Sequence, residues 1–162
     1  MPFTTADLVD SHAAVLKSCN AQFLEYGRRR SFSGAIRTVK TFEDNALVKK
    51  TLSTPGDGHV LVIDGAASLR CALVGDVIAG LAAANGWSGL VIWGAVRDAE
   101  ALKKIDLGIK ALGSNPWKSS KTGRGELDVP VGFGGMEFFP GHFLYGDPDG
   151  IVVSEQALPG VG

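Results

Sequence analysis

Cysteine is scarce in this chain, with two residues among 162. Cys19 and Cys71 stand far apart, and neither belongs to a CxxC pair or to a His/Cys cluster with the spacing of zinc ligands. A disulfide framework or a zinc site therefore has no support from the sequence. We expect both side chains to be reduced thiols.

An excess of charge of one sign is also lacking, because 16 basic and 17 acidic residues give a formal net charge of −1. No overall field therefore favours nucleic acid or an anionic membrane, and partners must be selected by local sites. No apolar run approaches the length that crosses a membrane, and Asp7 and Asp10 interrupt the segment where a signal peptide needs an apolar core. We expect a cytoplasmic protein without a membrane or direct nucleic-acid partner.

Familiar nucleotide and nucleophile motifs are missing as well. The chain has 22 glycines, but no GxGxxG opens a helix and KSSKTGRG lacks the order of a Walker A loop. The histidines His12, His59 and His142 lack the sequence signature of a serine or cysteine nucleophile. Dinucleotide binding and triad chemistry are therefore not predicted.

Hydrophobic residues make up 45% of the chain, enough for a sizeable core, and the length predicts a single domain over residues 1–162. Two short runs rich in β-branched residues, 59–65 and 89–96, predict buried strands. The segment 76–86 between them predicts a crossover helix, with Asp76 as a candidate N-cap. This βαβ pattern indicates a partly parallel sheet.

The flanking segments complete the expected fold class, which is α/β with a substantial antiparallel component. Gly/Pro punctuation between β-prone runs predicts mainly strands and turns in the last third of the chain. Further helices are expected from Thr4 or Thr5 onward, over 43–52 and over 98–108, and further strands over 35–42 and 109–115.

Two short segments form the candidate site. Gly75, Asp76, Val77 and Ile78 stand at the predicted start of the crossover helix, where backbone N–H groups without helical partners favour an anion such as a carboxylate. Arg97-Asp98 directly follows the second strand, at the carboxyl edge where open α/β sheets commonly bind ligands. Arginine holds oxyanions through a planar cation, and aspartate is a hard oxygen ligand for Mg²⁺.

A simpler interpretation explains the same residues without a site. Asp98 and Asp76 are both good N-cap residues for the helices that follow them, and Arg97 is an ordinary surface cation. From the residues alone, the two interpretations stand about equal.

The spacing of Asp76, twenty further residues and then Arg97-Asp98 resembles the D-X20-R-D motif of the RraA-like family. This family includes 4-hydroxy-4-methyl-2-oxoglutarate aldolases and regulators of ribonuclease E activity. TTADLVDSH, the block from GDVIAGLAAANG to DLGIKAL, and PGHFLYGDPDGIVV also resemble family segments in the same order, over nearly the whole chain. The resemblance implies a swivelling α/β/β/α domain with mixed sheets and a homotrimer with active sites near subunit boundaries.

The resemblance also implies roles for the site residues. Gly75, Asp76, Val77, Ile78 and Arg97 would bind a small 2-oxo acid, and Asp98 would hold a divalent cation, Mg or Mn. Arg97 and Asp76 would be the catalytic pair, with Asp76 orienting a water molecule or Arg97. The expected reaction is metal-dependent aldol cleavage of 4-hydroxy-4-methyl-2-oxoglutarate to pyruvate, with oxaloacetate decarboxylation as a side activity.

Two points stay open at this stage. The base that removes the C4 hydroxyl proton is unassigned, with metal-held water and a carboxylate of another subunit as candidates. The chain is also short beside the longer aldolases and in this respect looks more like the ribonuclease regulator. Inhibition of ribonuclease E through protein binding is therefore a second hypothesis, and length alone does not choose between the two.

Overall fold

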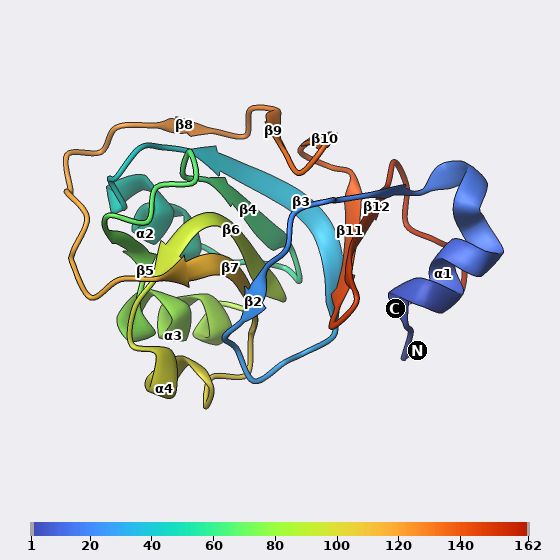
Figure 1. Ribbon diagram of the computed structural model, residues 1–162, viewed down its shortest axis with the longest axis horizontal. Helices are drawn as coiled ribbons and strands as arrows, with labels where there is room; N and C mark the ends of the chain where they lie inside the picture. The colour runs from blue at the N-terminus through green and yellow to red at the C-terminus, as the bar shows by residue number, and fades with distance from the viewer. Residues whose placement is uncertain (1, 162) are drawn as a thin grey trace.

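The computed structural model describes residues 2–161 and shows four stacked layers in the order helix, sheet, sheet, helix (Figure 1). The helices are α1 (Thr5–His12), η1 (Ala13–Val15, a 3-10 turn), α2 (Ala46–Leu52), α3 (Asp76–Ala84) and α4 (Ala99–Leu102). The strands are β1 (Lys17–Ser18), β2 (Leu24–Glu25), β3 (Phe32–Lys40), β4 (Val60–Asp64), β5 (Ala72–Val74), β6 (Gly89–Val96), β7 (Gly108–Ser114), β8 (Glu126–Leu127), β9 (Val131–Phe133), β10 (Met136–Phe138), β11 (Phe143–Asp147) and β12 (Gly150–Ser154).

The long strand β3 connects the two sheet layers. Its first half pairs antiparallel with β11, with Phe32 opposite Gly146, and its second half pairs parallel with β4, with Ile36 opposite Val60. The parallel part continues through β4, β6 and β7, and the antiparallel part continues through β11, β12 and β1. The predicted α/β class with a mixed sheet is thereby confirmed.

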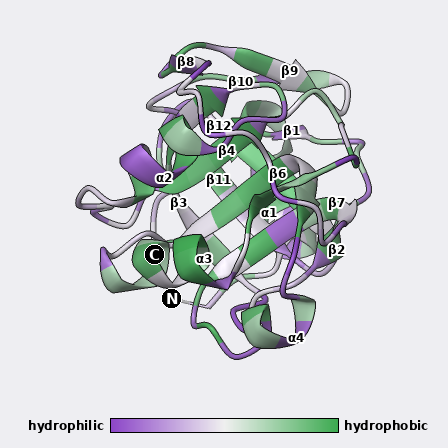
Figure 2. Cartoon of the chain, turned by 90° about the vertical axis from the view of Figure 1, so that its left-hand side faces the viewer, coloured by the Kyte–Doolittle hydropathy of each residue, from purple (hydrophilic) through white to green (hydrophobic). Residues whose placement is uncertain are grey.

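Three hydrophobic cores fill the spaces between the four layers. Alternation along β4 directs Leu61 and Ile63 toward α2 and α3, and Val60 and Val62 toward the antiparallel strands, because successive strand side chains point to opposite faces. The third core lies around Leu8 of α1, which packs with residues of β11, β12 and the C-terminal segment. Figure 2 shows the hydrophobic residues concentrated on the central strands β4 and β6.

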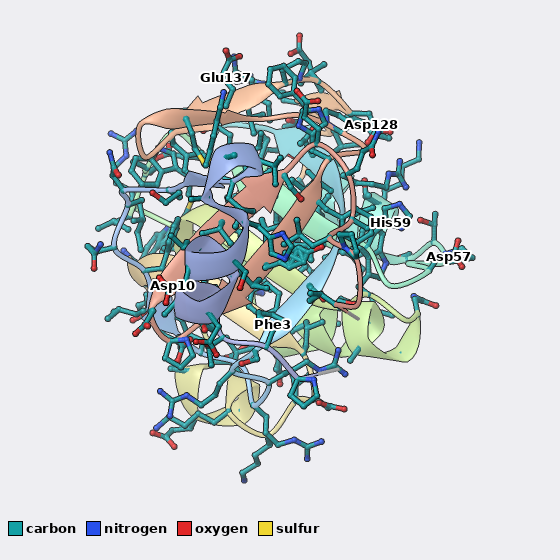
Figure 3. All side chains as sticks on the ribbon, turned by 90° about the vertical axis from the view of Figure 1, so that its right-hand side faces the viewer. Phe3, Asp10, Asp57, His59, Asp128 and Glu137 are labelled. Atoms are coloured by element: carbon teal, nitrogen blue, oxygen red, sulfur yellow. The ribbon has the colours of Figure 1, made fainter. Side chains whose placement is uncertain are left out.

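The N-terminal helix lies on the outer side of the antiparallel layer, opposite α2 and α3 (Figure 3). The predicted cap at Thr4 is present, since its hydroxyl accepts a hydrogen bond from the Asp7 N–H at 3.1 Å. Phe3 packs edge-on against Tyr145, with ring centroids 5.6 Å apart. Among the described residues, 2–161, no helix combines the length and apolar character needed to span a membrane.

Several predicted boundaries were wrong. The helix expected over 98–108 is a single turn, α4, because the chain then turns back to bond Arg28 and Arg29 through Ile105 and Leu107. The helix expected over 43–52 begins at Ala46, and the strand expected over 35–42 is β3, which begins earlier and ends at Lys40. Strand β5 was not predicted at all.

Candidate functional site

The two candidate segments meet at the carboxyl edge of the parallel strands. Strand β5 ends at Val74 and pairs parallel with β6, which ends at Val96. The Arg97 N–H donates to the Val74 carbonyl at 3.0 Å. This bond holds the segment that follows β6 against the end of β5. The structure therefore places Gly75–Ile78 beside Arg97-Asp98.

The Asp98 side chain does not cap the helix that follows it. Asp98 stands immediately before α4, but its carboxylate makes no hydrogen bond with that helix. Instead its Oδ2 atom accepts the backbone N–H of Asp76, the first residue of α3, at 3.0 Å. Asp98 thus satisfies one of the donors that a helix start leaves without a partner, across 22 residues of sequence.

Asp98 also has an unusual backbone conformation. Its φ of 60° and ψ of 43° lie in the left-handed region, which aspartate tolerates better than most residues other than glycine. Strained residues of this kind concentrate at sites that need a fixed side-chain direction. Here the conformation turns the carboxylate back toward Gly75 and the start of α3.

The capping interpretation of Asp76 is also wrong. Asp76 is the first residue within α3, and Gly75 holds the N-cap position without any side-chain hydrogen bond. The Asp76 side chain is exposed and interacts with the carboxyl group of Asp98. The carboxylates of Asp76 and Asp98 therefore both lie at this edge, and neither caps the helix that was predicted for it.

Gly75 is required by the close approach of the two charged residues. A Cβ atom at this position would lie 2.6 Å from Asp98 Oδ2, and 3.2 and 3.3 Å from Cγ and Nε of Arg97. A φ of −125° is accessible to any residue, so the constraint at Gly75 is the lack of space and not the backbone conformation.

Arg97 and Asp98 form a half-exposed ion pair. Arg97 Nε lies 3.8 Å from Asp98 Oδ2, and the two side chains are 35% and 36% exposed. The other end of the guanidinium makes a long contact of 3.5 Å from Nη1 to the Pro116 carbonyl. Arg97 and Asp98 do not form a close bidentate ion pair with each other, so both side chains can still bind a ligand.

The pKa of Asp98 is lowered from its ordinary value. The main cause is the hydrogen bond from the Asp76 backbone N–H, with further contributions from the Asp76 side chain and the positive charge of Arg97. Partial desolvation opposes these effects. The carboxylate is thus ionised at neutral pH, as a cation ligand must be.

The first turn of α3 adds backbone donors to the same edge. The first hydrogen bond of the helix runs from Ala79 N–H to the Gly75 carbonyl at 3.0 Å, so the N–H groups of Val77 and Ile78 precede the helical ladder. The Val77 side chain is 65% exposed, whereas Ile78 is anchored in the core. The core thus fixes donors that face an accessible surface.

The donor set fits a divalent cation that keeps most of its water. Asp98 Oδ2 accepts the backbone N–H of Asp76, and the Asp76 carboxyl group is adjacent to the Asp98 carboxylate. Within residues 2–161 no group of three or more His, Cys, Asp or Glu side chains converges on a common point. Mg²⁺ is commonly bound through one or two carboxylates, with water and substrate oxygens as further ligands.

The loop after β7 borders the site and was not predicted from the sequence. It joins β6 through Asn115 N–H and the Val96 carbonyl at 2.9 Å, and β5 through Ala72 N–H and the Trp117 carbonyl at 2.8 Å. Trp117 follows the carbonyl that Arg97 contacts, and it is 73% exposed. The available signal was the Asn-Pro pair before Trp117, because Asn-Pro favours a turn and turns lie at the surface.

The site is open to solvent within one chain. Two cavities of about 330 and 350 Å³ lie elsewhere, one beside α2 and one between α1 and β12, and neither includes Gly75, Arg97 or Asp98. His59 directly precedes β4, at the amino end of that parallel strand.

Comparisons with known proteins agree on one family. The family model described as RraA-like, Aldolase/RraA, matches residues 5–153. A structure from Geobacillus kaustophilus HTA426, described as S-adenosylmethionine: 2-dimethylmenaquinone methyltransferase, is 42% identical, with 99% of each chain covered and a TM-score of 0.96.

Two further solved structures carry the RraA name. The RNA-processing inhibitor RraA from Thermus thermophilis is 43% identical, with 99% of this chain and 98% of that chain covered and a TM-score of 0.94. RraAS2 from Streptomyces coelicolor, described as an unusual member of the RNase ES inhibitor RraA protein family, is 25% identical, with coverages of 92% and 77% and a TM-score of 0.73.

Proposed function

The chain belongs to the RraA-like family, and on that premise we propose that it is a divalent-metal-dependent pyruvate aldolase. The substrate would be 4-hydroxy-4-methyl-2-oxoglutarate or a related 4-hydroxy-2-oxo acid, cleaved to pyruvate, with oxaloacetate decarboxylation as a side activity. The family includes both such lyases and inhibitors of ribonuclease E, so the site must decide between them.

One observation carries the proposal. The Asp98 carboxylate makes no hydrogen bond with its own helix and lies against Gly75, in a space that a single methyl group would fill. The Arg97 side chain approaches the same position, because a Cβ at Gly75 would also lie 3.2 and 3.3 Å from its Cγ and Nε atoms. This crowding is expected where a carboxylate, a guanidinium and helix N–H groups share one small ligand.

We assign a different part of the substrate–metal complex to each charged or polar group of the site. The backbone N–H groups of Val77 and Ile78 would bind the carboxylate of the 2-oxo acid at the positive end of α3. Asp98, through Oδ1, would hold the cation, and the adjacent Asp76 side chain would orient water in the site. A divalent cation supplies a Lewis acid that polarises the 2-oxo group.

Arg97 would stabilise the charge that cleavage produces. As the C4 hydroxyl loses its proton to a base and becomes a carbonyl, the C3–C4 bond breaks. Its electron pair passes to the pyruvyl fragment and delocalises onto the 2-oxo oxygen until C3 takes up a proton to give pyruvate. A fixed guanidinium beside that oxygen stabilises the developing charge without reorganisation. Loss of CO₂ from oxaloacetate leaves the same fragment, so one site serves both reactions.

We further propose that the protein is a homotrimer in which a neighbouring subunit covers this edge. The site is an open surface within one chain, and apolar side chains near it are exposed, including Leu69, Val77 and Trp117. A second chain would exclude water from the ion pair, which strengthens its electrostatic effect. From family membership we further propose that the protein is cytoplasmic.

Inhibition of ribonuclease E is the second candidate. It is favoured by the 43% identity to a protein described as an RNA-processing inhibitor, over almost the full length of both chains. Under this hypothesis the function would reside in a protein-binding surface, and substitution of Arg97 or Asp98 would leave it largely intact.

A paired assay distinguishes the two. The purified protein is incubated with 4-hydroxy-4-methyl-2-oxoglutarate or oxaloacetate plus Mg²⁺ or Mn²⁺, and pyruvate release is followed; the same preparation is tested for binding to purified ribonuclease E. The aldolase proposal predicts saturable pyruvate release that Asp98→Asn abolishes. Ribonuclease binding without turnover of either substrate would replace it by the inhibitor hypothesis.

A further inference from the structure

One of the two cavities lies beside α2, away from the residues assigned above. It has a volume of about 330 Å³ and is lined by Asn45, Ala46, Lys49, Lys50, Ser53 and Lys121. Ala46, Lys49 and Lys50 share one face of α2, because residues three and four apart are neighbours on a helix, and the C-cap Ser53 continues this face. The small side chain of Ala46 leaves the hollow between this face and the loop that carries Lys121.

The positive charge around this cavity is not neutralised. None of Lys49, Lys50 and Lys121 forms an ion pair with any residue in the range 2–161, although the chain as a whole has a net charge of −1. The Lys121 ammonium group is held by a neutral partner instead, the Asn45 side-chain oxygen, at 3.3 Å. Hydrophilic residues form the outer side of α2 (Figure 2).

The loop wall of the cavity is rigidly attached. The buried carboxylate of Asp44 accepts hydrogen bonds from the Ser120 hydroxyl at 2.8 Å, the Thr122 hydroxyl at 2.6 Å, and the backbone N–H groups of Thr122 and Gly123. These bonds flank Lys121 on both sides. Its backbone is therefore fixed opposite α2 before any ligand arrives, which lowers the entropic cost of binding.

We infer that this cavity is a binding site for a small phosphate-type oxyanion, separate from the Arg97–Asp98 site. Three lysines line it, and lysine is a common point-charge ligand for phosphate. Its volume is at the small end of the range for ligand sites. No acidic or aromatic side chain lines it, so it offers neither a cation ligand nor a platform for stacking a nucleobase.

This site has a structural connection to the candidate active site. The Asn45 side chain, whose oxygen holds Lys121, donates from Nδ2 to the Leu73 carbonyl at 3.2 Å. Leu73 lies in β5, two residues before Gly75. An anion that draws Lys121 away from Asn45 would thus act on a side chain that supports the strand leading to Gly75.

The test is an isothermal titration calorimetry experiment in which inorganic pyrophosphate is added to the metal-free protein at low ionic strength. We expect saturable binding at one site per chain that weakens as salt is added. Lys121→Gln and Lys49→Gln should each lower the affinity by about tenfold or more, the effect of losing one charge-assisted hydrogen bond. Circular dichroism should show the same fold for each variant.

Two matched controls give the result its meaning. Lys104→Gln removes another exposed lysine, one that lies outside the cavity, and should leave the affinity unchanged. Arg97→Gln removes the cation of the other site and should also leave it unchanged. Absence of saturable binding, equal losses in Lys104→Gln, or a loss confined to Arg97→Gln would each overturn the assignment. The outcome is independent of the proposed aldolase activity, since neither metal nor 2-oxo acid is present.

Discussion

The substitution Gly75→Ala tests the geometry of the Arg97–Asp98 site with a single methyl group. The new Cβ atom would stand 2.6 Å from Asp98 Oδ2, whereas ordinary contact begins near 3.4 Å, so the oxygen must move by about 0.8 Å. That movement disturbs its hydrogen bond with the Asp76 N–H and displaces the carboxylate proposed to hold the cation. A misplacement of about 1 Å can cost about a hundredfold in rate, and we expect a loss of that order.

The same substitution should barely change stability. Alanine can adopt the backbone conformation of Gly75, and its smaller unfolded-state entropy contributes about 0.4–1 kcal/mol in favour of folding. The disturbed hydrogen bond to the half-exposed carboxylate, which water partly replaces, costs roughly 1 kcal/mol. The two effects offset each other, and the melting temperature should shift by no more than about 2–4 °C.

The assay compares Gly75→Ala with Gly80→Ala, a second glycine substitution in the adjoining helix. A Cβ atom at Gly80 meets no heavy atom within 4 Å, so this control should gain about 0.5–1 kcal/mol of helix stability and keep full turnover. Pyruvate release from oxaloacetate and thermal unfolding are measured for both proteins. Wild-type turnover in Gly75→Ala would refute the inference that these atoms form the site.

Three further predictions address the ion pair, the loop and the assembly. Arg97→Lys should keep the fold and lower kcat by about a hundredfold or more, because lysine keeps the charge but not the planar fork; near-wild-type kcat would remove Arg97 from the mechanism. Asp44→Asn should lower the unfolding free energy at pH 7 by about 1–3 kcal/mol in urea titrations. Although burial acts to raise the pKa of Asp44, hydrogen bonds from Thr122, Ser120 and Ala46 lower it below the usual range. The contribution of Asp44 to folding stability is therefore complete above about pH 4 and declines in acid. The difference in unfolding free energy between the wild type and Asp44→Asn should shrink there. Light scattering should give three times the chain mass, and a monomer at all concentrations would exclude the trimer.

The sequence predicted best those elements whose signal is local. The strand β6 was predicted with its observed bounds, Gly89–Val96, because a β-branched apolar run ends there at a charged pair. Strand β5 was missed because its three residues, Ala72–Val74, are too short to show any periodicity. That strand brings Gly75 beside Arg97. Without it, the sequence offered no structural reason for the segment 75–78 to contact Arg97-Asp98.

The roles of the two aspartates depended on contacts that no local pattern contains. Asp98 precedes a helical segment and resembles an N-cap, yet its left-handed conformation turns it toward the Asp76 N–H of another helix. The helix after it also ended early, since the following chain turns back and its Ile105 and Leu107 carbonyls accept the backbone N–H groups of Arg28 and Arg29. In each case tertiary contacts overrode a local preference. The family resemblance had named Asp76, Arg97 and Asp98 together, and the structure places them side by side.

The most direct measurement is pyruvate release from oxaloacetate as a function of Mn²⁺ concentration, for the wild type and Asp98→Asn, after rigorous removal of metal by chelation. Asparagine matches aspartate in size and remains a good N-cap, so the variant should fold and assemble as the wild type does. The proposed mechanism predicts that wild-type turnover requires Mn²⁺ and saturates with it, while Asp98→Asn shows none at any concentration tested. Full activity of the folded variant, or of the chelated wild type, would contradict a metal site at Asp98.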